Sequence, residues 1–203
     1  MSREDTFWNW FTGHERELFQ FDPRNVTERE QLFDDLAAEL QKVHRDLAFE
    51  FGPRDGRREF VISAGGIKNV FPAVVRLTQA APSLERWQVT AFRPRRSPIM
   101  PIEIGDKNID PTEVKFTLLD NGKTAGLYLF IPGFREGDVD FQQIGYLMLD
   151  QSLGEYDVET RLGLIKMLPL DARTQGERHP LPELPAMFDR LVSRLEGRSG
   201  KTS

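Results

Sequence analysis

The spacing of apolar and polar residues predicts a chain that alternates between helices and strands. Between residues 28 and 46 apolar side chains recur every three or four positions, which is typical of an amphipathic helix. The segment Thr27-Glu28-Arg29-Glu30 has the S/T-x-x-E form of a capping box, so this helix is expected to begin there. Further helices are expected at about 7–18, 66–80, 141–153 and 187–195. Strands are expected at 47–51, 58–63, 87–92, 102–104, 114–119, 126–131 and 161–168.

The clearest turn signal is Asn121-Gly122, which separates the strand expected at 114–119 from the apolar run at 126–131. A type I′ turn requires a positive φ at both central residues, and Asn-Gly tolerates this well. The sequence therefore predicts an antiparallel hairpin over residues 114–131 that closes through a type I′ turn.

The order strand–strand–helix–strand occurs at residues 47–92 and again at 114–168. A helix between two strands is typical of a right-handed crossover that joins strands of one sheet. The expected fold is a single α+β domain over residues 1–196. It has a single mixed β-sheet of about six strands with four or five packed helices, built from the two strand–strand–helix–strand units. Residues 197–203 are small and polar, and we expect them to form a disordered tail.

Composition removes several classes of function. The 203 residues include no cysteine, which excludes a disulfide scaffold, a thiolate zinc site, thiol catalysis and CxxC redox chemistry. A net charge of −5 argues against nucleic acid or an anionic membrane as a general partner. The N-terminus carries acids and no apolar signal core, and the most apolar run, 125–131, is far too short to span a bilayer. A cytoplasmic location is expected.

The densest aromatic cluster lies near the N-terminus, at Phe7, Trp8, Trp10 and Phe11. Such rings either lock a terminal helix onto the core of the chain or supply contact residues for a partner, including a second copy. The sequence alone leaves both interpretations open.

A candidate anion site follows the strand at 58–63. Ser63 and two glycines lead into a helix, where free backbone N–H groups and the helix dipole favour an anion. If the flanking strands are parallel, the arginines after the strand at 87–92 lie at the same sheet edge, in a locally basic part of the chain. The candidate ligand-binding residues are Ser63, Gly65, Gly66, Lys68, Arg93, Arg95 and Arg96. The alternative interpretation is that the two glycines only form a tight turn and that the arginines balance acids elsewhere in the chain.

A second cluster is acidic. Its members are Asp150, Glu155, Asp157 and Glu159. If these carboxylates converge, they could ligate Mg²⁺ or Ca²⁺, but their spacing does not match an EF-hand loop, and a solvated helix end is acidic for simpler reasons. The sequence assigns no metal site and no cofactor.

Catalytic motifs are missing from the sequence: it has no HExxH, GxSxG or SxxK pattern. The first hypothesis is therefore a non-enzymatic interaction protein, such as an adaptor or an immunity-type inhibitor. One alternative is a small-anion-binding module that uses the 63–69 loop. The other is a metal-assisted hydrolase that uses the carboxylates of 150–159.

Two segments of the sequence resemble segments of other proteins. The segments APSLERWQVTAFRPRR (81–96) and LDQSLGEYDVET (149–160) resemble parts of bacterial conserved-hypothetical proteins, a family of unknown function. The resemblance implies a bacterial cytosolic protein and assigns no catalytic or binding residue.

Overall fold

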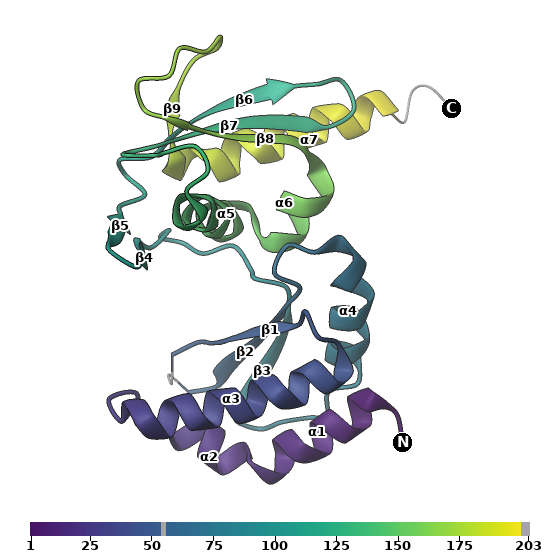
Figure 1. The fold of residues 1–203 in the computed structure, drawn as a ribbon. Helices are drawn as coiled ribbons and strands as arrows, with labels where there is room; N and C mark the ends of the chain where they lie inside the picture. The colour runs from purple at the N-terminus through teal and green to yellow at the C-terminus, as the bar shows by residue number, and fades with distance from the viewer. Residues whose placement is uncertain (54–55, 200–203) are drawn as a thin grey trace. The chain divides into compact units, whose positions relative to one another are not determined.

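The computed structural model describes residues 1–53 and 56–199 and shows an α+β protein (Figure 1). The chain divides into two compact units, Met1–Arg93 and Pro94–Ser203, and each contains its own sheet and its own hydrophobic core. Within the described residues, no helix combines the length and the apolar content that a membrane crossing requires.

The first unit places three helices before a small sheet and one helix inside it. Its elements are α1 (Arg3–Gly13), α2 (Glu15–Gln20), α3 (Val26–Val43), β1 (Ala48–Phe51), β2 (Arg58–Ser63), the 3-10 turn η1 (Lys68–Val70), α4 (Phe71–Gln79) and β3 (Trp87–Ala91). The strand order is β1-β2-β3, with β2 antiparallel to β1 and parallel to β3.

The start of α3 differs from the sequence prediction. The cap of α3 is Asn25, whose side chain accepts a hydrogen bond from the Glu28 N–H at 3.3 Å. The predicted capping box at Thr27 is therefore wrong. Asparagine is as good a cap as threonine or better, so the helix begins one residue before Thr27.

Aromatic rings fill the first core. Phe7, Trp8 and Phe11 of α1 are buried, and the Phe11 ring lies 4.9 Å from that of Phe60 on β2. The Trp8 indole N–H donates to the Leu77 carbonyl of α4 at 2.8 Å. Trp10 is only half-buried. Three of the four predicted cluster rings are therefore buried in the chain's own core, and Trp10 packs against the same core.

The second unit contains a four-stranded sheet and a separate two-stranded ribbon. The elements are β4 (Ile102–Ile104), β5 (Lys107–Ile109), β6 (Lys115–Asp120), β7 (Ala125–Ile131), α5 (Val139–Leu153), α6 (Glu155–Arg161), β8 (Leu162–Pro169), β9 (His179–Pro180), the 3-10 turn η2 (Leu181–Glu183) and α7 (Leu184–Ser199). The order in the larger sheet is β8-β7-β6-β9, in which β7 is antiparallel to β6 and parallel to β8. The ribbon pairs β4 with β5.

The predicted repeat of strand–strand–helix–strand is confirmed. In both copies the first two strands form an antiparallel hairpin, and the third strand joins parallel to the second. The predicted single sheet of six strands is wrong, because each copy forms a sheet of its own over its own core. Periodicity identifies strands but does not say which strands pair. The described residues also form seven α-helices, more than expected.

The hairpin over 114–131 is confirmed, with Asp120 opposite Ala125. Its turn is not type I′, because residues 121–124 form a four-residue connection and only Gly122 of the Asn-Gly pair has a positive φ, of 84°. The Gly122 N–H donates to the Asp120 carboxylate at 2.9 Å, which gives this longer loop its own support.

Residues 197–199 of the predicted tail belong to α7, and residues 200–203 lie outside the described residues. A single domain over 1–196 stays a prediction, since two compact units can still fold as one cooperative body.

Candidate functional site

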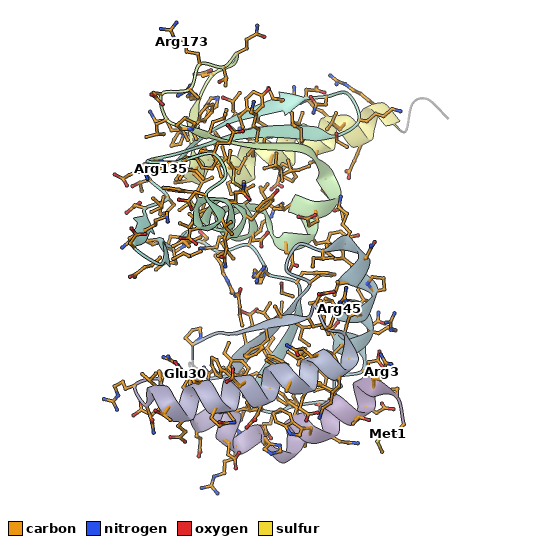
Figure 2. The ribbon with its side chains drawn as sticks, viewed as in Figure 1. Met1, Arg3, Glu30, Arg45, Arg135 and Arg173 are labelled. Atoms are coloured by element: carbon orange, nitrogen blue, oxygen red, sulfur yellow. The ribbon has the colours of Figure 1, made fainter. Side chains whose placement is uncertain are left out.

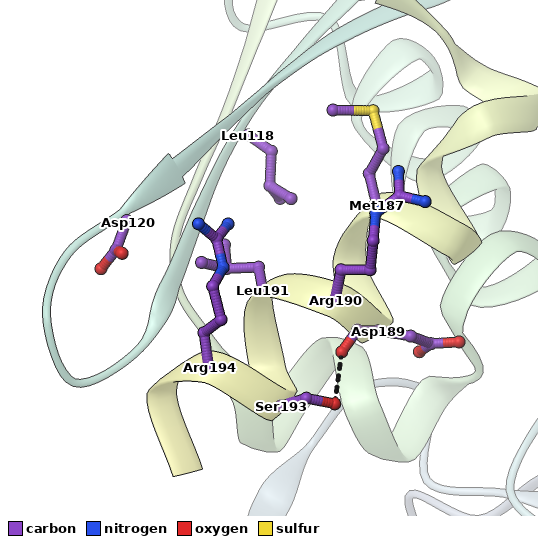
Figure 3. A pocket seen from close by; sticks show the side chains of 8 residues that line it. All are labelled: Leu118, Asp120, Met187, Asp189, Arg190, Leu191, Ser193 and Arg194. Carbon is purple, nitrogen blue, oxygen red and sulfur yellow. Dashed lines mark hydrogen bonds between the residues drawn. The ribbon is translucent and has the colours of Figure 1, made fainter. Parts of the chain in front are cut away.

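A pocket of about 770 Å³ lies between the end of β6 and one side of α7 (Figure 3). We call it the β6–α7 groove. Its lining residues are Leu118, Asp120, Met187, Asp189, Arg190, Leu191, Ser193 and Arg194.

The periodicity of α7 explains why arginines line this groove. The helix buries Leu184, Phe188, Leu191 and Leu195, a stripe with the spacing of one helical face, against the second core. Arg190 and Arg194 are one turn apart on the flank of that stripe and are exposed. Their place on α7 therefore follows from the stripe that the helix must bury.

The strand supplies the opposite wall. Alternate residues of β6 share a face, so Leu118 lies on the same side as the buried Phe116. Figure 3 shows Leu118 pointing from the strand toward α7, with the side chains of Arg190 and Arg194 rising from the helix on the side that faces β6. The result is an apolar floor with two cations beside it.

The two aspartates that line the groove each form an ion pair with an arginine outside its lining. Asp120 pairs with Arg198 at 2.8 Å, and Asp189 pairs with Arg95 at 2.9 Å. The pKa of Asp120 is lowered mainly by the hydrogen bond from the Gly122 backbone, and also by Arg198. The hydrogen bond that Arg95 donates to the Asp189 carboxylate raises the pKa of Arg95. Both carboxylates are therefore paired with an arginine.

The two arginines that line the groove, in contrast, form no such ion pair within the described residues. Within the described part of the chain, neither Arg190 nor Arg194 has a hydrogen-bond or ion-pair partner. Arg194 contributes only a longer-range attraction to Asp120. Two guanidinium groups beside an apolar surface can bind carboxylates through paired N–H donors.

The loop predicted to bind an anion has a different geometry from the one expected. The helix does not open at the two glycines: Gly65 and Gly66 form a turn with φ of 58° and 78°, η1 follows, and α4 begins at Phe71. The Gly65 N–H donates to the Ser63 hydroxyl at 2.9 Å, and the Ile67 N–H donates to the Ala64 carbonyl at 3.1 Å. The Gly65 and Ile67 amides are therefore already used within the loop.

The three arginines expected beside this loop are divided between the units. Because β2 and β3 are parallel, Arg93 follows β3 at the same sheet edge as the 63–69 loop, as predicted. Its guanidinium pairs with Glu50 of β1 at 2.5 Å. Arg95 and Arg96 belong to the second unit, where they line a pocket of about 560 Å³.

Arg95 has structural partners in that unit. Its guanidinium donates to the Leu153 carbonyl at 2.8 Å and pairs with Asp157 and Asp189. The Arg96 backbone N–H donates to the Gln151 carbonyl at 2.7 Å. Arg95 therefore links the last residue of α5 to α6 and α7.

The acidic cluster of 150–159 is partly buried rather than convergent. Asp150 and Glu155 are buried, and Asp157 pairs with Arg161 at 2.9 Å besides Arg95. Among the described residues, no group of three or more histidine, aspartate or glutamate side chains is arranged to hold a metal ion.

Sequence reasoning did not single out Arg190 or Arg194. A signal was present: two arginines at i and i+4 border the apolar stripe of the last predicted helix. It could not identify the strand that faces them, because Leu118 is about seventy positions away in the sequence.

Comparisons of the chain with protein-family models, curated proteins and solved structures found no match. The function is therefore argued from the groove itself.

Proposed function

We propose that this protein is a non-enzymatic interaction protein whose β6–α7 groove binds an acidic segment of a partner protein. The observation that carries the proposal is the pair Arg190 and Arg194, which have no partner side chain among the described residues and flank the apolar floor at Leu118. The cytoplasm remains its expected location.

Charge complementarity selects the partner. Met187, Leu191 and Leu118 offer apolar surface, while the two guanidinium groups attract carboxylates. A glutamate side chain fits both the apolar surface and the guanidinium groups, because its methylene groups can contact the floor while its carboxylate reaches an arginine. Exposed ion pairs contribute up to about 1 kcal/mol each, so the interaction should be of moderate affinity and sensitive to salt.

The groove is a better candidate than the 63–69 loop. In that loop the Gly65 and Ile67 amides already donate within the turn, so an anion would have to displace existing hydrogen bonds. In the groove the two arginine side chains are exposed, and no described hydrogen bond or ion pair of theirs needs to break.

Fluorescence anisotropy with defined peptides tests the proposal. The probe is a labelled, capped eight-residue peptide of alternating glutamate and valine, and the comparison peptide replaces glutamate with lysine. We expect the glutamate peptide to bind and the lysine peptide not to bind. The affinity for the glutamate peptide should fall as the salt concentration is raised. The double variant Arg190→Glu/Arg194→Glu should bind it at least about tenfold more weakly, because each lost pair and each new repulsion adds to the cost.

Arg135 and Arg173 provide a matched control. Both are exposed arginines of the same unit, outside the groove lining, and are labelled in Figure 2. The variant Arg135→Glu/Arg173→Glu changes the net charge by the same amount and should bind like the wild type. Equal weakening in both double variants, or no binding of the acidic peptide to the wild type, would contradict the proposal.

A further inference from the structure

One wall of the groove includes the edge of a sheet. The last strand on this side, β9, pairs with β6 only at Lys115 and Phe116. Beyond Phe116 no strand in the described part of the chain pairs with this side of β6, so Leu118 and Asp120 lie on an open edge.

The alternation of the ladder shows which backbone groups face that edge. In the hairpin the Asn121 N–H donates to the Thr124 carbonyl at 3.2 Å, so the backbone of Asn121 points toward the β7 side. Backbone groups of an antiparallel strand alternate between its two sides. The N–H and C=O groups of Leu118 and Asp120 therefore point away from β7, in the same direction as those of Phe116, which meet β9.

The chain before β9 leaves this edge uncovered. The Thr117 hydroxyl donates to the Glu177 carbonyl at 3.0 Å, and the Arg178 guanidinium lies 3.9 Å from the centre of the Phe130 ring. Leu129 and Ile131 face the second core. Phe130 lies between them in sequence, so its side chain is on the opposite face of the sheet. The connection therefore folds over that opposite face and does not continue along β6.

We infer that the acidic partner segment adds to β6 as a short strand, pairing with the backbone of Leu118 and Asp120. This inference rests on the proposed function and specifies how the segment binds. Strand addition takes its affinity from main-chain hydrogen bonds and its specificity from every second side chain. The added strand also supplies hydrogen-bond partners to the backbone of an edge that could otherwise pair with other chains.

The geometry sets the pattern of the partner. Neighbouring strands place paired side chains on the same face, so alternate side chains of the segment lie on the side of Leu118 and face α7. Those positions are next to Arg190 and Arg194 and should be acidic. The intervening positions lie on the side of Leu119. We therefore expect an extended segment with acids at every second residue.

Backbone methylation of the peptide tests strand addition directly. Two isomers of the glutamate–valine peptide carry N-methyl groups either on the glutamate amides or on the valine amides. Only one of these sets can donate to β6, since the amides of an extended segment alternate between its two edges. Methylation of that set should weaken binding at least about tenfold, while methylation of the other set should leave it nearly unchanged.

Amide hydrogen exchange followed by NMR gives a second readout on the protein. The amides of Leu118 and Asp120 should exchange more slowly when the unmethylated peptide is bound. The amide of Leu119, which faces β7, should change little and is the internal control.

The two hypotheses fail in different ways. If the peptide binds the wild type, is weakened by Arg190→Glu/Arg194→Glu, but is equally affected by both methylation patterns and leaves the Leu118 amide unprotected, strand addition is overturned and the proposed function stands. If the acidic peptide does not bind, or ignores the two arginines, the proposed function fails first.

Discussion

Asp120 and Arg198 form an ion pair of 2.8 Å that joins the end of β6 to the last turns of α7. These residues are 78 positions apart in sequence, and Asp120 also lines the β6–α7 groove. The carboxylate of Asp120 also accepts the Gly122 N–H, so one side chain supports the hairpin turn and the helix.

Replacing Asp120 should therefore have a pH-dependent effect on stability. The pKa of Asp120 is lowered in the folded protein, chiefly by the Gly122 backbone hydrogen bond and also by Arg198. A lowered folded pKa stabilises the fold above the ordinary aspartate pKa of about 3.9, and this stabilisation is lost as the pH falls through the folded value. Urea unfolding of Asp120→Ala should show a deficit at pH 7 that shrinks below about pH 4. A deficit that grows on acidification would contradict this assignment.

Gly122→Val should destabilise the protein by about 1–2 kcal/mol, because a β-branched residue resists the positive φ at this position. A Cβ atom there would meet no neighbour within 4 Å, so the cost comes from the backbone and not from a clash. Lys123→Val, next to it in the same exposed loop, is the control and should change the unfolding free energy by about 0.5 kcal/mol or less. Equal effects of the two substitutions in urea unfolding would argue against backbone strain.

Arg58→Met should destabilise the first unit by about 2–3 kcal/mol, because it leaves a buried and a half-buried carbonyl without the guanidinium donor. The Arg58 guanidinium donates to the Gly52 and Leu18 carbonyls at 3.0 and 3.1 Å, and lies over the rings of Phe21 and Phe51. Methionine keeps the apolar stem but supplies no donor and no cation–π contact. Arg3→Met, on the exposed side of α1, should be nearly neutral in the same denaturation measurement.

Trp8→Phe should lower the free energy of unfolding by about 1–2 kcal/mol, since phenylalanine cannot donate to the Leu77 carbonyl. Trp10→Phe is the matched control, because Trp10 is half-buried and its ring stacks on His14 with a centroid distance of 4.4 Å. Thermal unfolding followed by circular dichroism should separate the two variants. A larger loss in Trp10→Phe would indicate that the inner face of α1 has been assigned wrongly.

Local pattern determined much of the secondary structure. The alternation along 114–119 and the apolar run at 126–131 correspond to β6 and β7, since side-chain alternation reflects one buried face of a strand. The helical spacing around Phe188 and Leu191 likewise corresponds to α7. Helix ends were less predictable, because several residues near Asn25 could cap and only the folded backbone selects one. The short strands β5 and β9 hold too few residues to show any period.

Tertiary structure alone decided the sheets and the groove. The repeat of two strands, a helix and a strand was visible in the sequence, but whether the copies share one sheet depends on pairing between distant segments. Leu118, Arg190 and Arg194 meet because α7 buries its apolar stripe against the core beneath β6, leaving the flanking arginines at the edge of that strand. Periodicity determines which face of each element is buried; the packing of those faces determines which exposed residues become neighbours.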